Sequence, residues 1–192
     1  APRKAGQMVV DAFVYLFGNN QKYQLTIKAF NHNTTRVYNN FIDKNIIGLP
    51  DEMYSNIKII TDDYNDDQLL KLYYDHDVLV YPSYGEGFGF ISLQGLASGM
   101  PTICTESWAH YKNYLGPLKL KSEIIDSPWP FPHLGKVFEP SYEHLLKQIK
   151  DVSENFKAYS GYYYAQSTKI HEDYNWLQLT NKAFDPIFKK FS

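Results

Sequence analysis

The stretch at residues 81–101, YPSYGEGFGFISLQGLASGMP, decides the fold of this chain. An apolar run at 78–80 precedes it, and a second apolar run at 102–104 follows it. Between them, apolar residues recur at helical spacing until Gly99 and Pro101 end the helix. The pattern predicts a strand, a glycine-rich loop, a helix and a second strand, which together form a βαβ unit.

The loop in front of this helix is a predicted anion site. The helix is expected to begin near Gly87, Phe88 and Gly89, where the first N–H groups lack partners and the helix end carries partial positive charge. Glycine lets a ligand approach the backbone closely. Glu86 lies in the loop, and Gln94 on the second turn leans back toward it. A carboxylate and an amide beside an anion site suit a nucleotide sugar, which carries a diphosphate and many hydroxyls.

Three blocks of this stretch, residues 82–83, 86–89 and 97–101, resemble the donor-site signature of GT4-type retaining GT-B glycosyltransferases. That family has two glutamates separated by seven residues. Glu86 matches the first, and Gln94 replaces the second. The amide exchanges a charge-assisted hydrogen bond for a neutral one, so donor binding is expected to weaken by about 1 kcal/mol.

The resemblance implies an α/β fold: a Rossmann-like parallel sheet flanked by helices, equivalent to the C-terminal half of GT-B enzymes. It implies that Glu86 holds hydroxyls of the donor sugar and that Lys4 neutralises charge on the leaving nucleotide. It implies no metal, and no cofactor beyond a nucleotide-diphosphate sugar as donor. The residues expected to bind that substrate are Arg3, Gly87, Phe88, Gly89, Phe90, Gln94, Thr61 and Asp62.

The same resemblance implies which parts of the family's fold this sequence contains. In the family, a strand precedes the helix expected here at 5–17, and this first strand is absent from the sequence. We expect residues 1–192 to form one nucleotide-sugar-binding domain with a helical segment at about 141–192. We expect the acceptor-binding domain to lie upstream, so that the isolated domain is inactive. The acceptor remains open between a glycan, a lipid, a protein and a modified DNA base, and the loop at 127–135 is similar to insertions in phage-encoded glycosyltransferases.

The composition limits the classes of protein to which this chain can belong. The chain has 19 Lys+Arg against 21 Asp+Glu, and 44% of its residues are hydrophobic, which favours a globular domain over a broad nucleic-acid surface. No apolar run reaches membrane-spanning length and no signal-peptide pattern opens the chain, so a cytoplasmic protein is expected. Cys104 lies in an apolar run and is predicted to be a buried thiol.

Other patterns predict the remaining elements. Asn65 and Gln68 form a predicted capping pair for a helix at 66–75 with Leu69, Leu70 and Tyr73 inward. Trp176 is expected in the core, and Asp185 with Pro186 is expected to restart a helix. Further strands are predicted at 23–30, 57–60 and 136–140, an extended segment at 118–125, and helices at about 37–46, from Ser141, and at 161–174.

Several alternative interpretations stay open. Gly85-Glu86-Gly87 begins like a dinucleotide-binding motif with Glu106 about 20 residues on, but Phe90 occupies the third glycine position. A non-catalytic module and a GT-B epimerase or phosphorylase are also possible readings. The acidic residues of 62–67 fit helix capping and solvation better than a metal site. For Arg3 and Lys4 the alternative is a solvated terminus. His110 stays open between a residue that faces the donor sugar and an ordinary surface residue.

Overall fold

A computed structural model describes residues 2–29, 55–129, 131 and 133–191. The helix predicted at 37–46 lies outside these residues. The βαβ unit is confirmed: β3 (Leu79–Tyr81), α4 (Phe90–Ala97) and β4 (Thr102–Thr105) follow one another, and the two strands pair in parallel. Gly95 permits the close packing of this unit, because a Cβ there would lie 2.6 Å from Cδ2 of Leu79.

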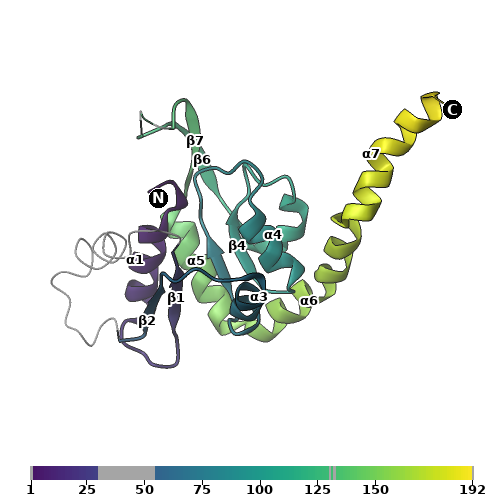
Figure 1. Cartoon of the computed structure of the whole chain (residues 1–192). Coiled ribbons are helices and arrows are strands. Elements are labelled where there is room, and N and C mark those ends of the chain that lie inside the picture. Colours follow the sequence, from purple (N-terminus) through teal and green to yellow (C-terminus); the bar gives the residue numbers. More distant parts are fainter. Residues whose placement is uncertain (1, 30–54, 130, 132, 192) are drawn as a thin grey trace.

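The strands form three separate groups (Figure 1). β1 (Leu25–Lys28) pairs in parallel with β2 (Ile57–Ile60), and β5 (Lys119–Leu120) extends the β3–β4 pair, again in parallel. β6 (Ser122–Asp126) and β7 (Lys136–Pro140) form an antiparallel hairpin. The parallel α/β arrangement is therefore confirmed, whereas the strand predicted at 136–140 belongs to a hairpin and not to the parallel sheet.

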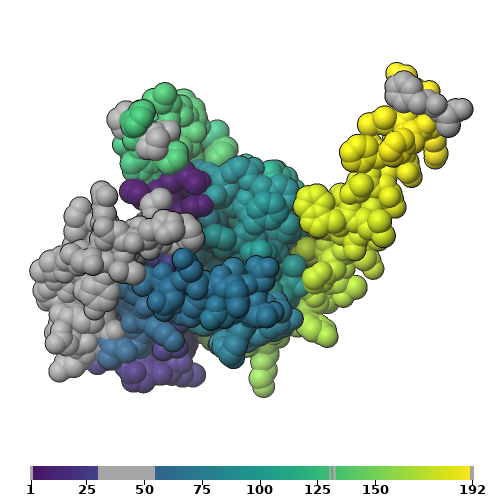
Figure 2. Space-filling view, in the orientation of Figure 1, coloured from purple at the N-terminus to yellow at the C-terminus, as the bar shows by residue number. Residues whose placement is uncertain are grey.

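Helices cover the strands. The described helices are η1 (Pro2–Lys4), α1 (Gly6–Phe17), α3 (Asp66–Tyr74), α4, η4 (Lys112–Leu118), α5 (Tyr142–Glu154), α6 (Phe156–Asp173) and α7 (Trp176–Phe191). α1 packs on α5, and α4 packs on α6. α7 extends away from the rest of the described surface (Figure 2).

The core lies around β4, whose four residues are all buried. Fully buried side chains from the βαβ unit, β5 and the later helices meet there, among them Leu96, Ile103, Leu115, Leu120, Leu145 and Tyr163. Cys104 belongs to this core, as predicted, and burial raises the pKa of its thiol to about 12. Removing these apolar surfaces from water is the main stabilising contribution to such a core.

The predicted caps of α3 and α5 are confirmed, whereas two predicted core positions and one predicted helix start are wrong. Asn65 and Gln68 form the predicted capping box at the start of α3, and the Ser141 hydroxyl caps α5. Leu69 and Tyr73 of that helix are half-buried, as predicted, and so is Leu72, whereas Leu70 is 49% exposed. Trp176 is 79% exposed rather than in the core. Helix α7 runs through Pro186 without restarting at Asp185.

Candidate donor site at the carboxyl ends of the strands

The N-terminal turn is bound to the loop that follows β3. The carbonyl oxygen of Arg3 accepts a hydrogen bond from the backbone N–H of Tyr84 at 2.9 Å. Ala5 closes the turn with a φ of 52°, which is uncommon for a residue other than glycine. These contacts place the side chains of Arg3 and Lys4 over the loop that carries Glu86.

Glu86 is the centre of a network of polar side chains. Its Oε1 atom accepts from Lys4 Nζ at 2.5 Å, Ser83 Oγ at 2.6 Å and Tyr81 Oη at 2.9 Å. Arg3 Nη1 lies 3.2 Å from the same oxygen, and the Glu86 side chain is only 9% exposed. Lys4 also donates to Tyr81 Oη at 2.7 Å, so two cations and two hydroxyls hold one carboxylate.

This network sets the charge state of Glu86. Burial acts to raise the pKa of the carboxyl, but hydrogen bonds from Lys4, Ser83 and Tyr81 outweigh it, and the net pKa lies below its ordinary value of 4.5. Tyr81 shows the opposite effect, since burial and the neighbouring Glu86 charge raise its pKa. Glu86 is therefore ionised at neutral pH and Tyr81 is a neutral donor.

The lowered pKa predicts how Glu86 contributes to stability. A carboxyl whose pKa is lower in the folded state stabilises the fold above its ordinary pKa, and this contribution disappears as pH falls through the folded pKa. We therefore expect Glu86→Gln to flatten the acid limb of unfolding free energy against pH, and Ser83→Ala to flatten it less. Urea unfolding at a series of pH values below 4.5 measures this. An unchanged slope in Glu86→Gln contradicts the assignment.

The glycines of the loop have different roles. Gly89 caps α4 with a φ of 81°, and a Cβ there would overlap the Trp108 ring and the Tyr111 hydroxyl. Both aromatic residues are buried and bonded to the loop: Trp108 Nε1 donates to Ser83 O at 2.8 Å, and Tyr111 Oη donates to Gly89 O at 2.5 Å. At Gly87, a Cβ would meet no atom within 4 Å. Gly89 is thus required by the fold, whereas Gly87 borders open space.

The two phenylalanines after Glu86 lie beside these glycines. Phe88 is half-buried, and its ring lies 4.6 Å from that of Phe90 and 4.9 Å from that of His110. Phe90 is 58% exposed, and His110 is also exposed. The start of α4 therefore presents an aromatic surface beside the glycine loop.

Gln94 does not join the Glu86 network and lines a neighbouring cavity instead. Its Oε1 accepts from the Tyr73 hydroxyl of α3 at 3.2 Å. Gln94, Tyr73 and Lys4 line one cavity of about 720 Å³, and Glu86 contacts Lys4 without lining that cavity itself. Lys4 therefore contacts Glu86 and lines the same cavity as Gln94, the two residues that were predicted to bind the donor sugar.

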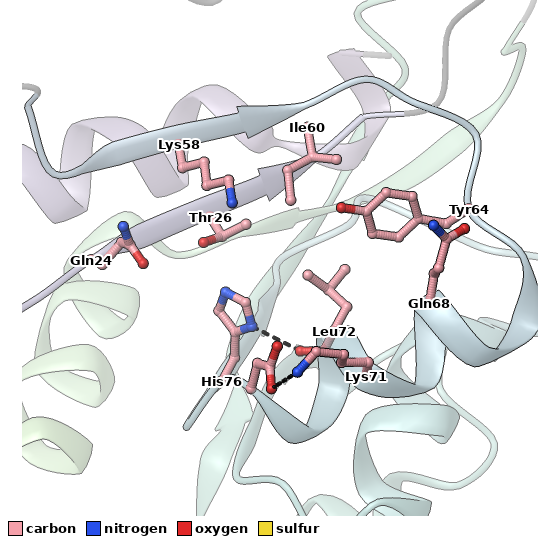
Figure 3. Close-up of a pocket in the computed structure, with 10 residues that line it drawn as sticks. Gln24, Thr26, Lys58, Ile60, Tyr64, Gln68, Lys71, Leu72 and His76 are labelled. Atoms are coloured by element: carbon pink, nitrogen blue, oxygen red, sulfur yellow. Dashed lines mark hydrogen bonds and ion pairs between the residues drawn. The ribbon is translucent and has the colours of Figure 1, made fainter.

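The turn after β2 lines the 720 Å³ cavity with different residues from those expected. Asp63 and Tyr64 line the 720 Å³ cavity, whereas Thr61 and Asp62 are not among its lining residues. Tyr64 also lines a second cavity of about 380 Å³, where Thr26, Lys58 and Ile60 of the β1–β2 pair face the side chains of α3 (Figure 3). The predicted binding roles of Thr61 and Asp62 remain predictions.

Sequence reasoning missed three hydroxyl partners of the site. Tyr81 and Ser83 donate directly to Glu86, and Tyr73 donates to Gln94. Tyr81 and Ser83 lie in the stretch that carries the motif, so their proximity in sequence was an available signal. Tyr73 sits on a helix 21 residues away from Gln94, and nothing in the sequence connects the two.

Two further properties of the described residues bear on function. Within residues 2–29, 55–129, 131 and 133–191, no three His, Cys, Asp or Glu side chains gather in a way that holds a metal ion. Among the same residues, no helix combines the length and apolar character needed to cross a bilayer.

Comparison with solved structures defines the class of fold. No family model matches the chain. Sucrose-phosphate synthase from Thermosynechococcus elongatus matches 100% of this chain and 43% of its own, with a TM-score of 0.69 and 15% identity. WaaG, a glycosyltransferase involved in lipopolysaccharide biosynthesis, matches 86% of this chain and 40% of its own, with a TM-score of 0.58 and 18% identity. The C-terminal domain of a group 1 family glycosyl transferase, LpcC from Francisella tularensis, matches 91% of this chain and 80% of its own, with a TM-score of 0.57 and 16% identity. The chain therefore has the fold of the C-terminal half of GT-B glycosyltransferases.

One curated protein is similar in sequence. Uncharacterized protein 356 of Sulfolobus islandicus rod-shaped virus 1 is 28% identical in an alignment of 153 residues that covers 74% of this chain. The chain spans 40% of that viral protein's length, and less than half of the length of sucrose-phosphate synthase and WaaG.

Proposed function

We propose that this chain is the donor-binding domain of a retaining glycosyltransferase and binds a nucleotide-diphosphate sugar. The observation that carries the proposal is the Arg3–Lys4–Glu86 cluster, which lies beside the open Gly87 backbone in front of α4. Ligands of parallel α/β sheets bind outside the carboxyl ends of the strands, and this cluster follows the carboxyl end of β3. The GT-B-like fold supports the same class.

The cluster suits a sugar diphosphate. Two cations against one carboxylate leave a net positive charge, and the first amides of α4 add donors of the same sign. A diphosphate that draws Lys4 toward itself would gain charge-assisted hydrogen bonds. Lys4 and Arg3 would then stabilise the charge that grows on the leaving nucleotide.

Glu86 would orient the sugar. All of the contacts that the described residues make with this carboxylate go to Oε1. The second oxygen, Oε2, is thus the acceptor proposed for hydroxyls of the hexose. Glu86 also holds Lys4 and Arg3 in place before the donor binds, so its role combines recognition with positioning of the cations.

The acceptor and its domain complete the proposal. An upstream domain would hold the acceptor, and transfer would occur between the two domains without a metal. The isolated chain is then expected to bind the donor without transferring it.

A second candidate is a non-catalytic module that has kept the fold. Two observations favour it: Gln94 stands where the related pattern has a glutamate, and the charge of Glu86 is balanced by Lys4 and Arg3 inside the chain. Calorimetry with a panel of UDP- and GDP-linked sugars separates the candidates. Binding of at least one of them supports the donor domain, and binding of none supports the second candidate.

Restoring a carboxylate at position 94 tests the role of Gln94. We expect Gln94→Glu to tighten donor binding about fivefold, because a neutral hydrogen bond to a sugar hydroxyl becomes charge-assisted, a gain of about 1 kcal/mol. The Tyr73 hydroxyl is able to donate to either side chain. The same calorimetric titration measures the change, with Gln94→Ala as the comparison. Equal affinity in all three proteins would show that position 94 does not touch the donor.

A further inference from the structure

The smaller cavity, between the β1–β2 pair and helix α3, has a mostly polar lining. It measures about 380 Å³ (Figure 3). Polar side chains reach it from the strands and from the end of α3, namely Gln24, Thr26, Lys58, Lys71 and His76. Small-molecule sites are concave and carry a few convergent polar groups, so this lining is suited to a ligand.

The polar end of this cavity lies away from the proposed donor site. Gln24 precedes the first residue of β1, and Lys58 is the second residue of β2, so both belong to the amino halves of their strands. The Glu86 cluster instead follows the carboxyl end of β3. Lys58 and Lys71 line the 380 Å³ cavity and not the 720 Å³ cavity. The two polar clusters are therefore separate.

The Thr26 hydroxyl is a buried group in need of a partner. Its Oγ1 atom is shielded from solvent and makes no hydrogen bond to any described residue. Buried polar atoms of native proteins nearly always have a partner, and an exception calls for an ion, a water molecule or another explanation. The cavity beside Thr26 is about ten times larger than the roughly 30 Å³ of one water molecule, so a larger partner fits.

The charges that line the cavity favour an anion. Lys71 is paired with Asp75, whose Oδ1 atom lies 2.8 Å from the lysine nitrogen. Lys58 makes no ion pair and no hydrogen bond with any described residue. Its ammonium group and the Thr26 hydroxyl point from the strands into the space in front of His76 (Figure 3). An ammonium group without a counter-charge among the described residues thus lies beside a hydroxyl without a partner.

The tautomer of His76 indicates which anion fits. Its Nδ1 atom lies 2.8 Å from the carbonyl oxygen of Leu72, and a carbonyl only accepts, so Nδ1 carries the proton of the neutral ring. The Nε2 atom then accepts from an O–H group or, in the imidazolium form, donates to an oxygen. A phosphate group that keeps a proton offers both an O–H group and oxygen acceptors. An ionised carboxylate offers acceptors only.

We propose that this cavity binds a phosphate group, either as inorganic phosphate or as the phosphate end of a small monoester. Lys58 and the Thr26 hydroxyl donate to its oxygens, and His76 contacts it from the α3 side. The ligand thereby joins the β1–β2 pair to α3 across the cavity. The proposal does not depend on the donor site, because the residues that carry it are different.

A titration with inorganic phosphate tests this inference. The ¹⁵N-labelled chain is titrated at constant ionic strength, so that screening of charges does not imitate binding. A second titration uses glycerol phosphate: tighter binding than inorganic phosphate identifies a monoester as the ligand, and equal or weaker binding identifies free phosphate. Lys58→Ala and Thr26→Val each remove one proposed donor. Lys157→Ala is the control, because it removes an exposed lysine from α6.

Saturable shifts are expected, largest at the amides of Thr26, Lys58 and His76. Lys58→Ala is expected to weaken phosphate binding about tenfold or more, and Thr26→Val about fivefold, because each loses a hydrogen bond to a charged group. Lys157→Ala is expected to bind as the original chain does. No saturable shift at these amides, or equal weakening by Lys58→Ala and Lys157→Ala, overturns the proposal. Shifts confined to the amides of 87–90 also overturn it, because phosphate then occupies the donor site alone.

Discussion

Replacing Glu86 with alanine is expected to lower kcat/KM of the proposed glycosyltransferase by about 100- to 1,000-fold. The change removes the proposed acceptor for the sugar hydroxyls. It also releases Lys4 and Arg3, which lie 2.5 Å and 3.2 Å from Glu86 Oε1. Misplaced electrostatic groups at a reacting centre commonly cost this much. Steady-state kinetics with the donor and acceptor measure the effect.

Glu139→Ala is the matched control for this experiment. Glu139 is exposed and touches the same loop, since its carboxylate accepts from the Tyr84 hydroxyl at 3.3 Å. It is not part of the proposed donor site, and its removal should leave kcat/KM within about a factor of two. Wild-type turnover in Glu86→Ala would refute the assigned role of Glu86.

Gly89→Ala is expected to destabilise the fold by about 2–5 kcal/mol. A residue with a side chain pays about 1–2 kcal/mol in the left-handed conformation that Gly89 adopts at φ 81°. The added methyl group also overlaps the Trp108 ring and the Tyr111 hydroxyl, and overpacking a core costs about 1–3 kcal/mol. Denaturant unfolding followed by Trp fluorescence measures the loss.

Gly87→Ala separates this structural effect from a binding effect. Position 87 has open space around its missing Cβ and no left-handed backbone, so the substitution should change stability by less than about 0.5 kcal/mol. If the donor diphosphate approaches this backbone, the methyl group should weaken donor binding about tenfold or more. Equal stability losses at positions 87 and 89 would contradict the different roles described for the two glycines.

Local sequence signals predicted the βαβ unit well. Gly and Pro residues indicated both ends of α4, and the Asn65–Gln68 capping pair indicated the start of α3. These signals succeed because a cap or a break depends on neighbours within four residues. The division of the parallel strands into two groups was not predictable in this way, because strand pairing depends on contacts between residues that lie far apart in the sequence.

Exposure was harder to predict than helix position. Leu70 and Trp176 are apolar residues that the pattern placed inward, yet they are 49% and 79% exposed. Helical periodicity shows which residues share a face, but packing of the whole helix decides which face is covered. Helix α7 shows this most clearly, because Leu177, Phe184 and Phe188 are exposed along with Trp176.

The candidate site was predictable where it depends on the motif. Glu86, Lys4 and Arg3 were each predicted separately, and the structure joins them into one cluster. Their partners Tyr81 and Ser83 were missed because an apolar strand end and a loop serine have common structural explanations. Gln94 was expected to face the Glu86 loop, and the structure bonds it to Tyr73 on α3, a contact made only by tertiary packing.

A nucleotide-sugar titration followed by amide chemical shifts tests the central claim most directly. The chain is labelled with ¹⁵N and titrated with the nucleotide sugar that binds best in calorimetry. The account predicts saturable shifts that are largest at the amides of Gly87, Phe88, Gly89 and Phe90, and that need about tenfold more ligand to saturate in Gly87→Ala. Saturable binding that leaves these four amides unmoved, or no binding by any UDP- or GDP-linked sugar, would contradict it.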